Sequence, residues 1–222
     1  MSASQNVTVE IKDDGSKLYI VKKLGTVKKK PLYDFVKRVF DFLFSFVALI
    51  VLSVPMLIIA LVVFINSEGP AFYKQERVGL NGKRFILYKF RSMRMDAESH
   101  GAQWAVDDDP RVTNVGRFMR MTRLDELPQL INILKGDMSF VGPRPERPIF
   151  YEQFAEYIDG FDERIKVVPG LTGLAQISGG YNLKPEEKVG YDIEYIENRS
   201  WWLDLKLMFK TVAVVFTHDG AK

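Results

Sequence analysis

The chain of 222 residues has the length of one ordinary domain with appendages, and its hydrophobic content of 47% is enough to form a sizeable core. Its formal net charge of +3 is too small to indicate a nucleic-acid partner, so we expect none. Cysteine is absent and only two histidines occur, which excludes disulfides, thiolate metal sites and a cysteine nucleophile. Nucleophilic or acid–base chemistry therefore falls to carboxylates, lysines or hydroxyls.

The first 30 residues are polar, and we predict that they form a poorly packed N-terminal extension. Turn-forming residues at 13–16 precede the apolar stretch 18–21, which is a candidate for one short strand. The predicted segments, in chain order, are the extension (1–30), a membrane helix (31–68), the main domain (69–217) and a tail (218–222).

A long apolar run at residues 42–65 could cross a bilayer of about 30 Å. Ser53 and Pro55 lie at its middle, where proline kinks a helix and a serine hydroxyl can satisfy a carbonyl that the kink frees. Basic residues flank the run on both sides. The positive-inside rule needs a difference between the two flanks, so it does not orient a spanning helix here. A kinked helix that enters and leaves by one face fits both features. A simple span is the alternative, since transmembrane helices tolerate proline.

A β-hairpin and a capped helix are predicted next. Residues 71–78 and 84–91 have the composition of two strands around a glycine-containing turn. A polar loop follows at 96–109. Thr113 can then cap a helix that runs towards Arg123.

Two adjacent carboxylates, Asp125 and Glu126, precede apolar residues with helical spacing, which indicates one buried helix face. Pro128 fits the first helical turn, which puts both carboxylates at the helix N-terminus, where backbone N–H groups favour anions. With arginines nearby, this arrangement suits a phosphate and Mg²⁺, which usually takes one or two carboxylates plus substrate phosphates. A capped helix with surface ion pairs is the alternative interpretation. The nearby basic residues are Arg117, Arg120, Arg123 and Arg144; the apolar ones are Leu127, Leu130, Ile131 and Leu134.

The last third of the chain predicts three more helices and one turn-rich loop. Residues 152–165 carry an aromatic stripe that either packs in the core or lies on a membrane surface. The loop at 168–175 contains small residues, which suits the approach of a ligand. Residues 191–198 and 201–216 are helical; the second has an apolar face beside lysines, typical of a membrane interface. The stripe is Phe150, Phe154, Tyr157 and Phe161, and the apolar face is Trp202, Leu205, Phe209, Val212 and Phe216.

Several segments in order make residues 37–216 resemble the bacterial sugar transferases that act on polyprenyl phosphate, the monotopic phosphoglycosyl transferases. The longest matching segment, 124–145, contains the carboxylate pair. Any one segment alone would be a weak signal, whereas so many in order are a strong one. The other matching segments are 37–42, 69–79, 88–93, 109–113, 169–173 and 202–206.

The resemblance implies an undecaprenyl-phosphate sugar phosphotransferase. Such an enzyme moves a sugar 1-phosphate from a UDP-sugar to undecaprenyl phosphate through a covalent aspartyl-phosphosugar and releases UMP, as the first membrane step of exopolysaccharide, capsule or O-antigen assembly. The implied fold is an α+β membrane-associated domain with a re-entrant helix broken at Ser53 and Pro55, a small β-hairpin and amphipathic interfacial helices around the active site. The implied location of residues 69–217 is the cytoplasmic face of the bacterial inner membrane.

The resemblance also implies roles for single residues. Asp125 matches the nucleophile, and Glu126 its partner in a dyad associated with Mg²⁺, so both are candidate metal residues. Lys89, Arg120 and Arg144 match basic residues at the phosphate site. A carboxylate can accept a phosphoryl group, nearby arginines would keep it ionised, and Mg²⁺ neutralises phosphates. The expected partners are a UDP-sugar, undecaprenyl phosphate and membrane lipids, and a homodimer is left open.

The sequence departs from the family's motifs at two places, and two other functions are compatible with its features. The family commonly has Ser-Pro at the helix break, whereas Val54 separates Ser53 from Pro55 here. Residues 173–176 and 178–180 also differ, so we do not carry sugar specificity over. The rivals are a membrane-anchored phosphate-binding scaffold without catalysis and a Mg²⁺-dependent diphosphate hydrolase without a lipid substrate. An assay of UDP-sugar turnover with and without lipid acceptor separates all three.

Overall fold

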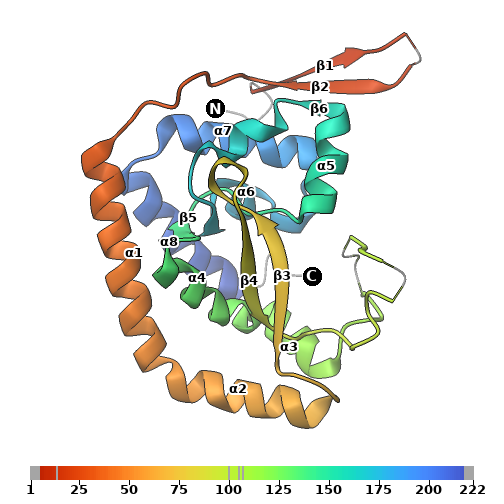
Figure 1. Ribbon diagram of the computed structural model, residues 1–222, viewed down its shortest axis with the longest axis vertical. Coiled ribbons are helices and arrows are strands. Elements are labelled where there is room, and N and C mark those ends of the chain that lie inside the picture. Colours follow the sequence, from red (N-terminus) through yellow and green to blue (C-terminus); the bar gives the residue numbers. More distant parts are fainter. Residues whose placement is uncertain (1–5, 14, 100, 105, 107, 218–222) are drawn as a thin grey trace.

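The computed structural model describes residues 6–13, 15–99, 101–104, 106 and 108–217. Figure 1 shows short helices gathered around a β-hairpin, with the first two helices forming an L-shaped arm along the left and the bottom of the view. The strands form three small sheets, in the orders β1-β2-β6, β3-β4 and β5-β7. The predicted α+β class is confirmed, and the predicted tail at 218–222 lies outside the described residues.

The elements are short except for α1, α2, α7 and α8. The α-helices are α1 (Pro31–Val51), α2 (Ser53–Asn66), α3 (Asn114–Met121), α4 (Leu130–Lys135), α5 (Pro148–Tyr157), α6 (Leu174–Ser178), α7 (Pro185–Asn198) and α8 (Trp201–Thr217). The strands are β1 (Val7–Ile11), β2 (Lys17–Val21), β3 (Phe72–Val78), β4 (Arg84–Phe90), β5 (Ser139–Val141), β6 (Ile158–Asp159) and β7 (Gly170–Thr172). The 3₁₀ turns are η2 (Leu80–Gly82), η3 (Leu124–Gln129), η4 (Phe161–Lys166) and η5 (Gly180–Asn182).

The apolar run forms two helices with a sharp bend, because α1 and α2 differ in direction by 63°. The break falls at Leu52, and the Ser53 hydroxyl donates a hydrogen bond of 2.7 Å to the Ile50 carbonyl. The predicted kink at Ser53 and Pro55 is confirmed, as is the serine's role in satisfying a carbonyl there. Among the described helices, none alone has the length and hydropathy of a membrane span, whereas α1 and α2 taken together do.

The arm is attached to the main domain by arginines that cap helix ends. Arg38 of α1 donates 2.8 Å hydrogen bonds to the carbonyls of Ile133 and Leu134 in the last turn of α4. Arg91, just after β4, donates to the Glu68 carbonyl beyond the end of α2 at 2.5 Å. The last carbonyls of a helix have no intrahelical partner and carry partial negative charge. Both arginines therefore satisfy exposed carbonyls and hold the arm to the domain.

A buried polar cluster around Asp204 joins α1, α7 and α8. Asp204 accepts hydrogen bonds from the hydroxyls of Tyr33 at 2.7 Å and Tyr195 at 2.9 Å. Its carboxylate also binds the Lys37 amine at 2.7 Å. A buried carboxylate is costly unless it is paired, and three donors satisfy this one.

The outer face of α8 is apolar and exposed. Trp202 is 78% and Phe209 74% accessible. The predicted apolar face therefore exists and points away from the domain, although the side chain of Phe216 lies outside those described. The outward residues of α2 are similarly exposed, among them Val54, Leu57, Ile58 and Leu61.

The predicted β-hairpin is confirmed as β3 and β4, which pair antiparallel around η2. Asn81 has a φ of 52° inside this turn, a left-handed conformation that asparagine tolerates better than most residues. On the other edge of β4, the Asn132 side chain accepts from the Tyr88 N–H at 3.1 Å and donates to the Ile86 carbonyl at 2.7 Å. One α4 side chain thus replaces a missing strand neighbour.

The expectation of a poorly packed N-terminal extension holds for β1, whose side chains are largely exposed, and is wrong for β2. The strand β2 pairs antiparallel with β1 and parallel with β6, so the segment forms the top sheet in Figure 1. Side chains alternate between the two faces of β2, and Val21 points into a core that contains Phe154, Phe161 and Ile193. Val21 is 1% exposed. The Leu24 N–H also donates to Glu163. Long-range packing, which local polarity does not report, orders this segment.

The helix predicted at 152–165 is also wrong in its limits. The helix α5 ends at Tyr157, and β6 and η4 follow because Gly160, with a φ of 82°, reverses the chain. The aromatic stripe is buried, with Phe154 at 8% and Phe161 at 1% exposure. Core packing is therefore confirmed and the membrane-surface alternative is contradicted, so α5 is not one of the predicted interfacial helices.

The packing of the N-terminal hairpin gives a stability prediction. Val21→Ala should lower the free energy of unfolding by about 2 kcal/mol, because it removes two buried methyl groups and leaves a cavity. Denaturant titration of the detergent-solubilised protein measures this loss. The matched control is Val9→Ala in β1, where the side chain is 52% exposed and the change should be small. Equal small losses for both variants would contradict the packing of this hairpin.

Candidate active site

The two carboxylates lie on a tight turn rather than on a regular α-helix. Asp125 and Glu126 occupy the first turn of η3, which passes directly into α4. Pro128 lies inside η3, so the expectation that it opens an α-helix is wrong. The left-handed residue Arg123, with a φ of 58°, separates η3 from the end of α3.

The predicted buried face of this helix also needs correction. In α4 the buried residues are Leu130, Asn132 and Ile133, whereas Ile131 and Leu134 are only partly buried. The residues before α4 form a 3₁₀ turn, which has fewer residues per turn than an α-helix. Applying the α-helical spacing through Pro128 therefore predicts the wrong buried side chains.

Glu126 is held by three cations. The Arg144 guanidinium donates to both of its oxygens, at 2.6 Å and 3.2 Å. The Lys89 amine lies 3.4 Å from Oε1, and an Arg123 nitrogen lies 3.9 Å from the same atom. Such a two-point contact fixes the planes of both groups, so Glu126 and Arg144 define one rigid wall of the site.

Close approach of β5 and β7 places Arg144. The strands pair in parallel, with Ser139 opposite Gly170. A Cβ on Gly170 would lie 2.0 Å from the Gly142 nitrogen, so a side chain cannot be accommodated there. The loop that follows β5 is thereby held against β7, and Arg144 extends from it towards the carboxylates.

The neighbouring carboxylates have different electrostatic environments. Burial by itself would raise the pKa of Glu126, but Arg144 and Lys89 hold that pKa well below its usual range. Burial raises the pKa of Asp125, and the charge of Glu126 adds to this, while Lys89, 3.9 Å away, opposes it. Arg120 and Arg144 lower the pKa of Asp125 as expected, but burial outweighs them, so the net pKa of this carboxyl is raised in the protein alone. Environments that separate two pKa values in this way are common where two acids have different roles.

One polar cavity of about 310 Å³ brings the predicted site residues together. Lys89 comes from β4, Arg120 from α3 and Arg144 from the loop after β5, and all three line this cavity with both carboxylates. Arg120 donates to the Ser92 hydroxyl at 2.9 Å. Arg117, which the sequence grouped with them, is exposed on α3 and does not line the cavity.

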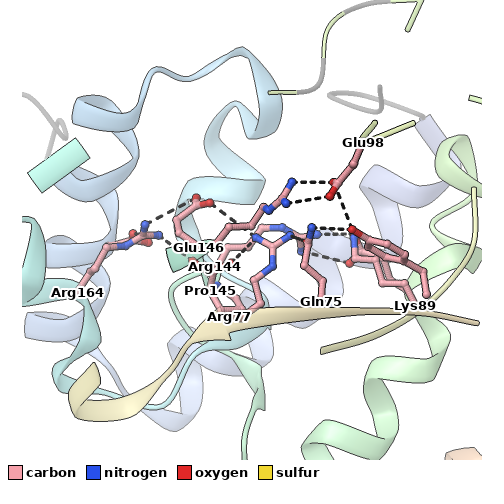
Figure 2. A network of polar contacts seen from close by, with 12 residues as sticks. Gln75, Arg77, Lys89, Glu98, Arg144, Pro145, Glu146 and Arg164 are labelled. Carbon is pink, nitrogen blue, oxygen red and sulfur yellow. Dashed lines mark hydrogen bonds and ion pairs between the residues drawn. The ribbon is translucent and has the colours of Figure 1, made fainter. Parts of the chain in front are cut away.

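A second row of charges lies behind Arg144, and sequence reasoning missed it (Figure 2). Arg164 of η4 donates to the Arg144 carbonyl at 2.8 Å and forms an ion pair of 2.7 Å with Asp192 of α7. It also lies 3.7 Å from Glu146, which faces Arg77 of β3 from the other side at 3.8 Å. These partners are far apart in the sequence, and no local motif connects them. Arg164 supports the backbone that carries Arg144.

The polar loop after β4 covers one side of the cavity. Arg147 donates to both oxygens of Glu98, at 2.8 Å and 3.0 Å, and the Tyr73 hydroxyl donates to the same carboxylate at 3.2 Å. Trp104 of this loop packs edge-on against Phe150, with ring centroids 5.2 Å apart. The predicted loop at 96–109 therefore contributes lining residues to the site.

The carboxylates supply the oxygen ligands that Mg²⁺ prefers. Among the described residues, no three acidic or histidine side chains are grouped as a metal cage. In phosphate-transfer sites Mg²⁺ usually binds one or two carboxylates and completes its shell with substrate phosphates and water. Asp125 and Glu126 fit this partial set, because each carboxylate oxygen has lone pairs beyond those used by Lys89 and Arg144.

Comparison with known proteins gives consistent matches along most of the chain. The family model described as bacterial sugar transferase matches residues 32–218. A UDP-N-acetylgalactosamine-undecaprenyl-phosphate N-acetylgalactosaminephosphotransferase from Aeromonas hydrophila is 44% identical over 202 residues, which are 90% of this chain and 48% of that protein.

Two further relatives carry names with other sugars. A UDP-glucose:undecaprenyl-phosphate glucose-1-phosphate transferase from Escherichia coli is 40% identical over 214 residues, covering 90% of this chain and 46% of that protein. An undecaprenyl-phosphate galactose phosphotransferase from Salmonella typhimurium is 43% identical over 202 residues, covering 84% and 42%. The chain thus spans about half the length of the curated relatives it matches.

The buried Arg164–Asp192 pair gives a pH prediction. Burial raises the pKa of Asp192 to about 6 although Arg164 opposes this. The folded protein then binds a proton that the unfolded chain, with a pKa of 3.8, has lost, so this group's contribution to stability falls as the pH rises from about 4 to 6. Relative to Asp192→Asn, the wild type should lose about 3 kcal/mol of unfolding free energy across this interval.

Denaturant titrations of both proteins at several pH values measure this difference. Titrating groups that both proteins share change the two unfolding free energies equally. Loss of the Arg164 ion pair in Asp192→Asn changes the difference between them by the same amount at every pH. Parallel stability profiles would show that Asp192 stays ionised throughout.

Proposed function

Because this chain belongs to the bacterial sugar transferase family, we propose that it transfers a sugar 1-phosphate from a UDP-sugar to undecaprenyl phosphate and releases UMP. The observation that carries the proposal is the buried Asp125–Glu126 pair at the end of a basic cavity. Relatives of similar identity are named for N-acetylgalactosamine, glucose and galactose, so the proposal specifies UDP-sugars as a class. The pathway proposed is bacterial surface-polysaccharide assembly.

In the proposed first step the Asp125 carboxylate attacks the phosphorus next to the sugar. A bond forms between a carboxylate oxygen and phosphorus, the bond from that phosphorus to the UMP oxygen breaks, and UMP leaves with the electron pair. In the second step an oxygen of undecaprenyl phosphate attacks the same phosphorus and displaces Asp125, which regains its carboxylate. Two displacements allow donor and acceptor to react in turn at one nucleophile.

The cations around the cavity provide the electrostatic part of this mechanism. Lys89 and Arg120 face the diphosphate from β4 and α3, while Arg144 holds Glu126 in a fixed plane. Preorganised charges stabilise a phosphoryl transition state without a reorganisation cost. Mg²⁺, which Asp125 and Glu126 would hold together with the diphosphate, supplies further neutralisation of the phosphate charge.

The bent arm supports a re-entrant arrangement on one membrane face. The outer side chains of α2 are apolar and exposed, as Leu57 at 70% shows, so the described part of the chain leaves them uncovered. The exposed Trp202 and Phe209 of α8 add a second apolar surface suited to an interface. A helix pair that enters and leaves by one face would keep the active site beside the membrane, where a cytoplasmic nucleotide sugar meets a lipid acceptor. The proposed location is therefore the cytoplasmic face of the bacterial inner membrane.

Incubation of the purified protein with radiolabelled UDP-sugars, with and without undecaprenyl phosphate, tests the function. A transferase makes labelled lipid only when the acceptor is present. A diphosphate hydrolase would turn over many UDP-sugar molecules without lipid, and a binding scaffold would turn over none, so either result contradicts the proposal.

The neighbouring carboxylates should differ when substituted. Asp125→Asn keeps the side-chain shape but lacks the attacking anion, so UMP release in the absence of lipid should fall at least about a thousand-fold. Glu126→Gln should weaken turnover and the response to Mg²⁺ together, with a remnant at high Mg²⁺. Intact-protein mass spectrometry after incubation with UDP-sugar alone should show a phosphosugar adduct on the wild type. An adduct that persists in Asp125→Asn would refute the assignment.

The re-entrant arrangement predicts that both ends of the arm lie inside the cell. Because native cysteine is absent, Lys29→Cys and Lys74→Cys each introduce a single exposed thiol. A membrane-impermeant maleimide should label neither variant in intact cells and both after permeabilisation. Labelling of one variant from outside would instead show a crossing helix.

A further inference from the structure

A second cavity of about 400 Å³ lies on the other side of the Glu126–Arg144 pair. Its walls come mainly from η3, α4, β5, β7, α6 and α8, and most of its lining surface is apolar, although half of the lining residues are polar or charged. Ligand pockets of this size, with apolar walls and a few polar groups at one end, are typical small-molecule sites. Representative apolar residues are Leu127, Leu130, Phe140, Leu171, Ala175 and Met208.

The two cavities share a charged wall. Arg123, Glu126 and Arg144 line both of them, so the polar cavity reaches this wall from one side and the apolar cavity from the other. A ligand in the apolar cavity could therefore present an anionic end to two guanidinium groups while the rest of it contacts hydrocarbon. This polarity fits an amphiphile with a phosphate at its end.

The other end of the apolar cavity adjoins the exposed face of α8. Val212 lines the cavity and is 56% exposed, so it lies at the rim. Phe209 of the same helix is 74% exposed. The apolar interior thus continues onto the helix surface suited to a membrane interface, and a chain too long for the cavity can extend from it without entering water.

A buried amide in this cavity lacks a partner. Both Gln176 side-chain atoms are buried and make no hydrogen bond within the described part of the chain. An unsatisfied buried polar group costs about 1–3 kcal/mol. An isoprene unit gives Gln176 no hydrogen-bond partner, so only an oxygen atom at the polar end of a lipid phosphate could remove this cost.

We propose that the apolar cavity binds the first isoprene units of the lipid acceptor, with the acceptor phosphate directed at Arg123 and Arg144. This inference rests on the proposed transferase function. A sugar in the same cavity could pair with Gln176 but would leave its other hydroxyl groups against apolar surface, which is unfavourable, and the nucleotide diphosphate has the more basic cavity available. The lipid chain then lies in a different cavity from the nucleotide, while the acceptor phosphate reaches past the Glu126–Arg144 pair to Asp125, which lines the polar cavity.

Narrowing the cavity rim tests the proposal. Val212→Trp should raise the KM for undecaprenyl phosphate about tenfold, which corresponds to about 1.4 kcal/mol of binding. The matched control is Ala213→Trp, because Ala213 is the next residue on α8, is exposed and does not line the cavity. An equal rise in both variants, or a rise in neither, would overturn the proposal.

Photo-crosslinking to the wild type provides a test that depends on no substitution. A short polyprenyl phosphate with a diazirine on its first isoprene unit should label peptides from α6 and α8. Label confined to α1 and α2 would place the chain along the arm and overturn the proposal. The adduct with UDP-sugar alone, measured on the same preparation, reports on the transferase function separately, so its absence would refute that function whatever the lipid label shows.

Discussion

The charged site depends on the buried ion pair between Glu126 and Arg144. A carboxylate that is 7% exposed is stable as an anion only if cations surround it, and here they come from β4, from Arg123 just before η3 and from the loop after β5. Pairing these groups requires the β5–β7 contact to be tight and Arg164 to support the loop. The charged site is therefore complete only when β4, β5, β7 and η4 are packed together.

Charged side chains at helix ends fix the direction of the arm formed by α1 and α2. A bent apolar helix pair has few contacts with which to fix its direction, and its exposed outer side chains add none. Arg38 and Arg91 bind the carbonyls at the ends of α4 and α2, and the Asp204 cluster fixes the start of α1 against α7 and α8. Polar contacts on the domain side thus set the angle of a helix pair whose outer surface is apolar.

Local sequence predicted those features that depend on neighbours in the chain. The Thr113 cap accepts from the Gly116 N–H at 2.9 Å as expected, and the hairpin β3–β4 and the break near Ser53 follow from turn, capping and proline chemistry. The α7 helix begins at Pro185, earlier than the predicted 191, because its first turn shows little apolar periodicity. The contacts of Arg164 and the raised pKa of Asp125 both result from burial between segments that are distant in the sequence, so neighbouring residues do not predict them.

The parallel pairing of β2 with β6 has a consequence for biosynthesis. The Leu24 N–H and the Glu163 carboxylate that accepts from it are separated by 139 positions, so the N-terminal hairpin cannot dock until most of the chain has left the ribosome. The apolar arm emerges well before that point, while the hairpin is still undocked. The hairpin thus precedes the arm in synthesis but can dock only after it.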